Sequence, residues 1–217
     1  KIEVPAGTIE VNYKMKNEKV KWVEIRNVDS YLADTNLMIH SDHMGEIKFD
    51  VSYGGNFYAI IESQKNYFGL KNYRAEELIS FSREIRDKIN KKYANRFIHP
   101  IDKSIRDVSH ILWTGQVLDN KSSSRNAVFY GDKAIDRSPC GTGSSARMAQ
   151  LFSQNKLKVG EAFIHESYIG SKFICRIEKS SKIHNIDGIS PIIRGWAKIH
   201  GYNKIIVDSS DPFYQGF

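Results

Sequence analysis

The sequence contains little cysteine and no long hydrophobic run, and both absences limit what the protein can be. Only two of its 217 residues are cysteines, Cys140 and Cys175, which excludes a disulfide-stapled secreted scaffold and a multi-cysteine zinc module. No apolar stretch approaches the ~20 residues that a helix needs to span a bilayer. We therefore expect a soluble, cytoplasmic protein without a membrane partner.

Positive charge is in modest excess, with 32 Lys and Arg against 25 Asp and Glu and a net charge of +7. The densest basic cluster lies in residues 72–96, where apolar residues recur every three or four positions, as on one face of an amphipathic helix. Asn72 is the predicted N-cap of this helix. A solvated helix face explains the basic residues better than a nucleic-acid partner, because no nucleic-acid-binding motif accompanies them. These basic residues are Arg74, Arg83, Arg86, Lys88, Lys91, Lys92 and Arg96.

Most of the remaining sequence has the alternation that is typical of β-strands. Residues 45–53 alternate clearly, residues 19–26 do so more weakly, and residues 57–61 form an apolar run after a Gly-Gly-Asn turn. Many strands with few helices predict a mixed, largely antiparallel α+β protein. Further strands are predicted at 110–114, 127–130, 163–167 and 173–178, and a hairpin at 195–199 and 204–207.

The segment 136–152, DRSPCGTGSSARMAQLF, carries the chemistry. Its second part is good helix material, and the small residues before it form a tight loop at the predicted helix N-terminus. The backbone N–H groups of such a loop form an anion pocket that suits a substrate carboxylate, while a Walker-type loop is excluded because its Gly-Lys-Ser/Thr ending is missing. We expect the helix N-terminus to lower the pKa of Cys140 and make it reactive, rather than a buried structural cysteine. Cys175 lies in an apolar strand pattern and is assigned to packing.

Two other groups of polar residues are candidates for ligand contacts. Asp136 lies at the lip of the Cys140 loop, where it could hold a substrate ammonium group or serve as a turn carboxylate. The run HSDH at 40–43 superficially suggests metal ligands, but two His and one Asp without further ligands are a weak pattern. We interpret this run as a loop and predict no metal site.

Five motifs follow one another along the chain in the order of a known family. They are VPAG at 4–7, YGGNFYAI at 53–60, DRSPCGTGSSARMA at 136–149, GEAFIHESYIGSKF at 160–173 and DPFYQGF at 211–217. Together they resemble the proline racemase family, which includes hydroxyproline epimerases and hydroxyproline dehydratases. The resemblance implies a cofactor-free inversion at the α-carbon of proline or a hydroxyproline, in which a thiolate takes the α-proton and a thiol on the opposite face returns one. By this resemblance Cys140 is one of the two acid/base cysteines, Asp136 binds the ring nitrogen, and the backbone of Gly141 and Thr142 binds the carboxylate.

The resemblance also implies a second acid/base cysteine in a Met-Cys-Gly-His type motif. The sequence has no such motif, and Cys175 does not match it. We therefore expect the chain, which begins at Lys1 without a Met, to be the central and C-terminal part of a family member and to be inactive alone. The implied fold is diaminopimelate-epimerase-like, with two pseudo-symmetric α+β halves, each an antiparallel sheet around a central helix. Residues 1–63 would end the first half and residues 64–217 would form the second, and the last strands could return to the first half.

Three residues bear on which activity of the family to expect. Cys140 favours an isomerase, because the dehydratases tend to have Thr at this position. His110 matches a His of hydroxyproline epimerases, and Tyr130 stands where proline racemases tend to have an apolar Phe. A His and a phenol can hydrogen-bond a ring hydroxyl that an apolar wall would leave unpaired. The alternatives are a strand-end His satisfied by backbone and a Tyr of the ordinary core.

We expect a 4-hydroxyproline epimerase that acts on a small imino acid, with proline racemase as the alternative. The rival from another class is a non-catalytic, truncated family member that binds ligand weakly or serves as a dimerisation piece. A homodimer is compatible with the sequence, and nucleic acid, metal and cofactor are not expected.

Overall fold

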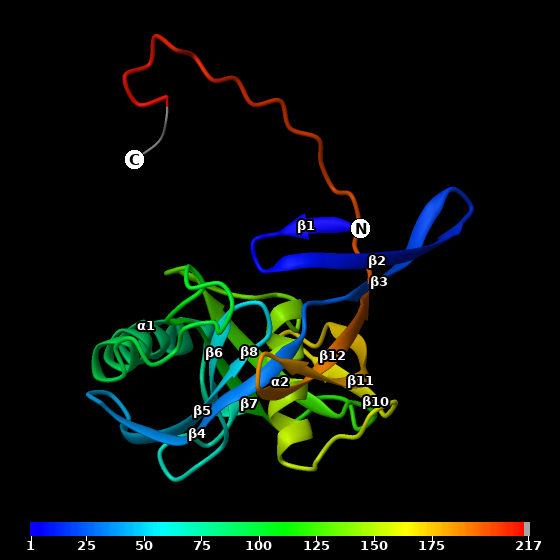
Figure 1. The fold of residues 1–217 in the computed structure, drawn as a ribbon. Coiled ribbons are helices and arrows are strands. Elements are labelled where there is room, and N and C mark those ends of the chain that lie inside the picture. Colours follow the sequence, from blue (N-terminus) through cyan, green and yellow to red (C-terminus); the bar gives the residue numbers. More distant parts are fainter. Residues whose placement is uncertain (215–217) are drawn as a thin grey trace.

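The structure is a computed structural model that describes residues 1–214, and Figure 1 shows its fold. The helices in this part of the chain are a short 3-10 helix (Leu70–Asn72), α1 (Ala75–Lys92) and α2 (Gly141–Ser153). The strands are β1 (Ile2–Val4), β2 (Gly7–Lys16), β3 (Lys19–Arg26), β4 (Ser30–Ser41), β5 (Gly45–Tyr53), β6 (Phe57–Ile61), β7 (Val108–Gly115), β8 (Ser124–Tyr130), β9 (Ala134–Ile135), β10 (Ala162–Glu166), β11 (Lys172–Ile183) and β12 (Ile186–Gly195).

Eight of these strands close into a barrel. In the order β4, β5, β6, β7, β8, β10, β11, β12, each strand pairs with the next, and β12 pairs with β4 to complete the ring. The β6–β7 and β8–β10 pairs are parallel, and the other pairs in the ring are antiparallel. The arrangement confirms the mixed α+β class.

Helix α2 lies inside the barrel, in contact with β4, β5, β6, β11 and β12 (Figure 1). Residues 143–151 are all buried, so the helix has no solvent face over this stretch. Most residues of this stretch are small or apolar, as a helix buried on every side requires. The two long polar side chains, Arg147 and Gln150, are hydrogen-bonded to each other and to Glu62 and Asp50. One cluster joins the start of α2 to the inner faces of three strands: Tyr58, Ile60, Leu112, Val128, Cys140 and Ala146.

Helix α1 covers the outside of the barrel, beside β4, β7 and β8 (Figure 1). Its buried residues Leu78, Ile85 and Ile89 follow the predicted apolar spacing. They pack with outward-facing side chains of the strands, among them Phe57 and Trp113. The outward-facing residues of β6 belong to the core cluster that holds the buried residues of α1, and its inward-facing residues pack with α2. All five residues of β6 are therefore buried, which explains its continuous apolar run.

Most of the predicted strands are confirmed. Residues 19–26, 45–53 and 57–61 are β3, β5 and β6, and the four later predictions fall within or across β7, β8, β10 and β11. The sequence does not predict β4 and β12, because both depart from simple alternation. The pairing of β4 with β5 shifts register on both sides of Asp34, and β12 contains Pro191 opposite a register shift in β11.

The predicted start of the long helix is wrong. The long helix begins after Arg74, whose backbone N–H donates to the Glu77 side chain at 2.8 Å, whereas the predicted cap Asn72 ends the preceding 3-10 helix. This carboxylate, at the third helical position, accepts from the backbone N–H of the N-cap residue, a donor that has no partner within the helix. Residue 63 lies between β6 and β7, a parallel pair joined by a crossover through α1, and the expected division of the protein into two halves at this residue stays a prediction.

An arm and a tail extend from the barrel at the β12 edge (Figure 1). Strand β3 pairs with β12, β2 with β3, and β1 with β2. Residues 196–214 continue from β12 without forming a strand, so the hairpin predicted at 195–199 and 204–207 is wrong. The reason is that the apolar side chains of this stretch lack a neighbouring strand, and Tyr202 is 92% exposed. In residues 1–214 neither α-helix is long and apolar enough to cross a membrane.

Candidate active site

The N-terminal end of α2 presents Cys140 inside the mouth of the barrel. Cys140 is the N-cap residue and has a φ of 64°, a backbone conformation that non-glycine residues adopt rarely. Its backbone N–H donates to Ser138 Oγ at 3.0 Å, and the N–H of Ser138 donates to Asp136 Oδ1 at 2.8 Å. The unusual backbone of Cys140 is thus held by a chain of hydrogen bonds from the preceding turn.

Two glycines allow this loop to pack as tightly as predicted. A Cβ atom on Gly143 would lie 3.2 Å from Cys140 Cβ and 3.3 Å from its Sγ. A Cβ atom on Gly54, in the turn between β5 and β6, would lie 2.1 Å from the backbone oxygen of Thr142. Gly141 has no heavy atom within 4 Å of such a position, so this part of the loop faces open space. The small residues therefore bring α2 against the β5–β6 turn and leave room beside Gly141.

Three donors surround the sulfur of Cys140. The Gly143 backbone N–H donates to Sγ at 3.4 Å, the Tyr58 hydroxyl lies 3.3 Å away and the Thr142 hydroxyl 3.6 Å away. The two hydroxyls also contact each other at 2.6 Å. This environment can stabilise negative charge on the sulfur, because all three groups can donate hydrogen bonds to it.

The prediction of a lowered pKa for Cys140 is wrong. Burial raises the pKa of the thiol, and the hydrogen bonds from Tyr58, the Gly143 amide and Thr142 only partly offset that effect. The charge of Asp136 raises it further. The physical reason is that the side chain is only 9% exposed, so that the thiolate has little water around it. In this structure the cysteine rests as a thiol at neutral pH.

His110 lies beside Tyr58 on the neighbouring strand. The two residues are paired across β6 and β7, and their rings stack with centroids 4.8 Å apart. Burial lowers the pKa of His110 to about 4, and the positive charge of Arg86 lowers it as well, whereas Asp136 raises it. Its Nδ1 lies 2.6 Å from Ser109 Oγ, so the ring is held by a side chain rather than by backbone. His110 is therefore neutral at pH 7, with one ring nitrogen engaged by Ser109.

Tyr130 and Asp136 also lie at this end of the barrel. Strands β7 and β8 pair Leu112 with Val128 and Ile111 with Phe129. The next position in this register brings Tyr130 opposite His110, on the same inner face as Val128 and Leu112. Tyr130 is 45% exposed, so it belongs to the rim and not to the ordinary core. Asp136 follows β9 and its N–H donates to Val128 O at 2.8 Å. Its contact with Ser138 also fits the alternative of a turn carboxylate.

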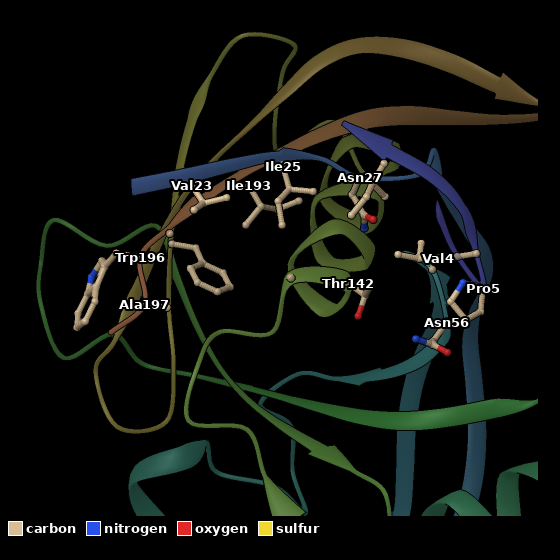
Figure 2. A pocket seen from close by; sticks show the side chains of 16 residues that line it. Val4, Pro5, Val23, Ile25, Asn27, Asn56, Thr142, Ile193, Trp196 and Ala197 are labelled. Atoms are coloured by element: carbon tan, nitrogen blue, oxygen red, sulfur yellow. The ribbon is translucent and has the colours of Figure 1, made fainter. Parts of the chain in front are cut away.

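A largely apolar cavity of about 550 Å³ adjoins the same helix end. Figure 2 shows Val23, Ile25 and Ile193 grouped on one side, Val4 and Pro5 on the other, and Thr142 at the end of α2. Within the described chain its lining includes Gly141 and Thr142 but not Cys140, His110, Asp136 or Tyr130. The predicted site residues therefore divide into two groups, one facing this cavity and one on the barrel side of Cys140.

Sequence reasoning missed Tyr58 and a set of buried polar residues that support the loop. Ser144 Oγ lies 2.8 Å from Nδ1 of His165, and Asn126 Nδ2 donates to Pro139 O at 2.8 Å. Burial lowers the pKa of His165 to about 3, so this His is neutral. Ser144 and His165 lie within the motifs of the resemblance, but only the closed barrel brings the two motifs together.

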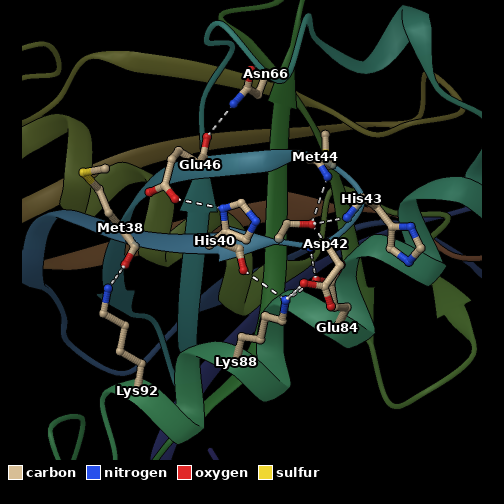
Figure 3. A network of polar contacts seen from close by, with 11 residues as sticks. Met38, His40, Asp42, His43, Met44, Glu46, Asn66, Glu84, Lys88 and Lys92 are labelled. Atoms are coloured by element: carbon tan, nitrogen blue, oxygen red, sulfur yellow. Dashed lines mark hydrogen bonds and ion pairs between the residues drawn. The ribbon is translucent and has the colours of Figure 1, made fainter.

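The HSDH run at 40–43 belongs to a polar network that joins the β4–β5 hairpin to α1 (Figure 3). His40 Nδ1 lies 2.9 Å from Glu46 Oε1, and Lys88 Nζ donates to Asp42 Oδ1 at 2.5 Å. Residues 40 and 41 end β4 and the turn begins at 42, so the loop interpretation holds only for the second half of the run. Across residues 1–214 no group of three or more His, Cys, Asp or Glu is arranged to hold a metal ion.

Basic side chains of α1 bond to neighbouring elements in the same way. Arg86 donates to Gly131 O and to Asp132, and Lys92 donates to Met38 O at 2.9 Å. These contacts explain the basic cluster as part of the fold. Cys175 is 1% exposed and packs in an apolar cluster with α2, which confirms its assignment to packing.

A family model described as "Proline racemase" matches residues 1–217. The 4-hydroxyproline 2-epimerase of Spirosoma linguale is 51% identical to the chain over 216 residues, and that of Shewanella loihica is 49% identical. Each match covers 100% of this chain and 64% of the relative, so the chain spans less than two thirds of their length.

Solved structures share the fold. A hydroxyproline epimerase from Agrobacterium vitis with bound trans-4-OH-L-proline is 26% identical, with a TM-score of 0.89 over 98% of this chain and 60% of that one. A probable proline racemase from Agrobacterium radiobacter K84 with bound carbonate is 27% identical, with a TM-score of 0.87 over 98% of this chain and 61% of that one. A PhzF family protein from Bacillus anthracis has a TM-score of 0.53 at 14% identity, over 88% of this chain and 62% of that one, and shares the fold alone.

Proposed function

The chain belongs to the proline racemase family, and from this premise we propose that the protein inverts the α-carbon of 4-hydroxyproline with Cys140 as one of two acid/base residues. The proposal rests on the three hydrogen-bonding groups around Cys140 Sγ: the Tyr58 hydroxyl, the Thr142 hydroxyl and the Gly143 backbone N–H. A sulfur within reach of three hydrogen-bond donors, at the N-terminus of a buried helix, can both hold a proton and accept the charge left when the proton departs.

The protonation state of Cys140 indicates its first step in the proposed reaction. Because burial raises the pKa of its thiol, Cys140 begins in the form that delivers a proton. In one direction a thiolate on the opposite face of the substrate removes the α-proton, and the Cys140 S–H delivers its own proton to the α-carbon from the other face. The second cysteine becomes a thiol and Cys140 a thiolate, so the reverse direction uses the same pair with roles exchanged. We propose that the second cysteine lies in a segment of the full-length protein that corresponds to the part of the relatives outside the match.

The charged groups of the substrate are proposed to bind on either side of Cys140. The backbone N–H groups of Gly141 and Thr142, at the positive end of α2, suit the carboxylate, which gains negative charge as the α-proton leaves. The carboxylate of Asp136 suits the ring ammonium. Binding the ammonium would release Asp136 from its contact with the Ser138 backbone. Holding both charges fixes the α-carbon relative to Sγ, as proton transfer requires.

Hydroxyproline is favoured over proline because the rim offers polar partners for a ring hydroxyl. His110 is neutral, with one ring nitrogen bonded to Ser109 and the other able to serve a ligand. The phenol of Tyr130 is a second candidate on the adjacent strand. The epimerase relatives support the same choice, and proline racemase remains the alternative.

For the whole protein we propose the diaminopimelate-epimerase-like arrangement of two halves, with this barrel as one half. The apolar cavity, the β1–β3 arm and the exposed apolar side chains of 196–214 are the surfaces proposed to pack on the other half, and the site lies between the two. Two free cysteines suit the reducing cytoplasm, where we propose that the protein acts. A homodimer remains a further proposal.

The test is inversion of trans-4-hydroxy-L-proline by the full-length protein, followed by optical rotation. We expect Cys140→Ser to reduce inversion by about 100-fold or more, since an acid/base group contributes roughly that much. Cys175→Ala is the matched control and should keep the parent rate. Full activity in Cys140→Ser would overturn the assignment of the base, a clear preference for L-proline would favour the racemase, and a folded parent without inversion of either imino acid would favour the non-catalytic rival.

A further inference from the structure

The hydroxyl of Tyr58 links the substrate-facing loop to the sulfur of Cys140. It lies 2.6 Å from Thr142 Oγ1 and 3.3 Å from Cys140 Sγ, and the side chain is fully buried. The ring stacks on His110 at 4.8 Å. One side chain therefore contacts three of the residues to which the proposed function assigns roles.

The position of this hydroxyl is set by the barrel and not by a loop. Tyr58 is the second residue of β6, between two neighbours that face the outer core, so alternation directs it toward α2. Pairing with His110 on β7 and stacking of the two rings restrict its rotation. The hydroxyl of Tyr58 is therefore a well-placed hydrogen-bond partner for the sulfur, 3.3 Å away.

Tyr58 can donate a proton in a hydrogen bond but is not suited to removing one from the substrate. Burial raises its pKa well above the usual range, and the neighbouring Cys140 raises it further. Both effects favour the protonated phenol, so Tyr58 is suited to donate a hydrogen bond. When Cys140 is a thiolate, the O–H can turn from Thr142 to the sulfur, and the bond to a charged acceptor is the stronger of the two.

We propose that Tyr58 is a positioning residue for Cys140: its hydroxyl holds Sγ at the mouth of the barrel and stabilises the thiolate form during proton transfer. The catalytic consequence rests on the proposed function, whereas the effect on the sulfur itself does not. The ionisable groups around the sulfur that act on its titration are Tyr58 and Asp136, with His110 beyond Tyr58 and Arg86 acting on His110. Of these, Tyr58 supplies a direct hydrogen bond to Sγ, while Asp136 opposes ionisation through its charge.

The test measures how fast iodoacetamide alkylates Cys140 in the full-length protein as a function of pH. Mass spectrometry of the peptide that contains Cys140 reports this thiol alone, so other cysteines do not contribute to the reading. Tyr58→Phe keeps the ring and its stacking but removes the hydroxyl. We expect the pH midpoint of alkylation to rise by about one unit, a tenfold smaller thiolate fraction at neutral pH, because a hydrogen bond to the charged form is lost. An unchanged midpoint in a folded Tyr58→Phe protein would overturn the proposal.

Tyr67→Phe is the matched control. Its hydroxyl is equally buried and donates to Thr114 O at 2.6 Å, away from the loop. The control loses a buried hydrogen bond without touching the sulfur, so its alkylation midpoint should equal that of the parent. A shift as large as that of Tyr58→Phe would show a general effect of destabilisation and overturn the proposal.

A second substitution keeps the hydroxyl and strengthens the same hydrogen bond, so the alkylation midpoint should shift in the opposite direction. Replacing Tyr58 with 3-fluorotyrosine makes the phenol a stronger donor, so the midpoint should fall below that of the parent. A rise or no change would contradict the proposal even if Tyr58→Phe failed to fold.

The catalytic readout separates this inference from the proposed function. In the full-length protein, Tyr58→Phe should lower kcat for hydroxyproline about tenfold with little change in KM, since Tyr58 acts on the sulfur and not on the substrate. A shifted midpoint in a protein that inverts no imino acid would defeat the proposed function and leave the assignment of Tyr58 standing. Normal inversion with an unchanged midpoint would defeat the assignment of Tyr58 alone.

Discussion

The rings of Tyr58 and His110 stack on each other, with centroids 4.8 Å apart and planes 30° apart. They come from adjacent parallel strands, β6 and β7, that pair at these two residues. Because the Tyr58 hydroxyl also reaches Cys140, the proposed specificity residue and the proposed acid/base residue are connected through one side chain. The register of the barrel therefore sets the geometry of the candidate site.

Replacing His110 with Phe should change substrate preference. The variant loses the polar partner of the ring hydroxyl, so kcat/KM for trans-4-hydroxy-L-proline should fall by roughly 10- to 100-fold relative to that for L-proline. The measurement is the ratio of the two kcat/KM values in the full-length protein. His40→Phe, an exposed histidine paired with Glu46, is the control and should keep the parent ratio. An unchanged ratio in His110→Phe would contradict the assignment of this residue to the hydroxyl.

Stability should decrease as the pH falls from about 6.5 to 4. The pKa of His110 is about 4 in the folded protein against a usual 6.5, so over this window the unfolded chain binds a proton that the folded protein does not. The loss from this group approaches about 3 kcal/mol at the lower end, and above pH 6.5 it has no effect. His165, with a pKa of about 3, also decreases stability as the pH falls, and its effect continues below pH 4.

Urea unfolding at a series of pH values measures this dependence. The free energy of unfolding of His110→Phe should change less steeply between pH 6.5 and 4 than that of the parent, because the group that titrates is gone. Equal slopes for the two proteins would show that His110 is not held neutral by burial.

Gly143→Ala should impair the chemistry more than the fold. The new methyl would lie 3.2 Å from Cys140 Cβ and 3.3 Å from both Sγ and the Tyr58 ring, so the sulfur must shift by a few tenths of an ångström. We expect a loss of about 1 kcal/mol in stability and about 100-fold in inversion, since small misplacements of a reacting group reduce rates strongly. Gly141→Ala, with open space around its Cβ, is the control for stability and should not lower Tm.

Gly54→Ala should be the more destructive glycine substitution. Its methyl would lie 2.1 Å from the backbone oxygen of Thr142 and 2.6 Å from the backbone nitrogen of Ala146, and neither atom can move without shifting α2. The expected loss is about 3 kcal/mol in the free energy of unfolding, measured by denaturant. A loss below about 1 kcal/mol would show that the β5–β6 turn can retreat from the helix.

Local features of the sequence predicted much of the fold. Alternation was sufficient for β3 and β5, a continuous apolar run for β6, and apolar spacing for α1, because these signals depend on neighbours within one element. Strands β4 and β12 escaped prediction because a register shift and a proline interrupt their periodicity. The hairpin expected after Gly195 failed because strand propensity does not form a strand without a partner.

The sequence by itself determined the family, the tight glycine loop and Cys140 at the start of a helix, since each depends on residues that are adjacent in the chain. Only the tertiary structure decided that β12 closes on β4, that α2 is enclosed on all sides, and that Tyr58 reaches the sulfur. It also reversed the expected direction of the Cys140 pKa. Burial is a property of the assembled barrel, and desolvation by that barrel outweighs the hydrogen bonds that the loop provides.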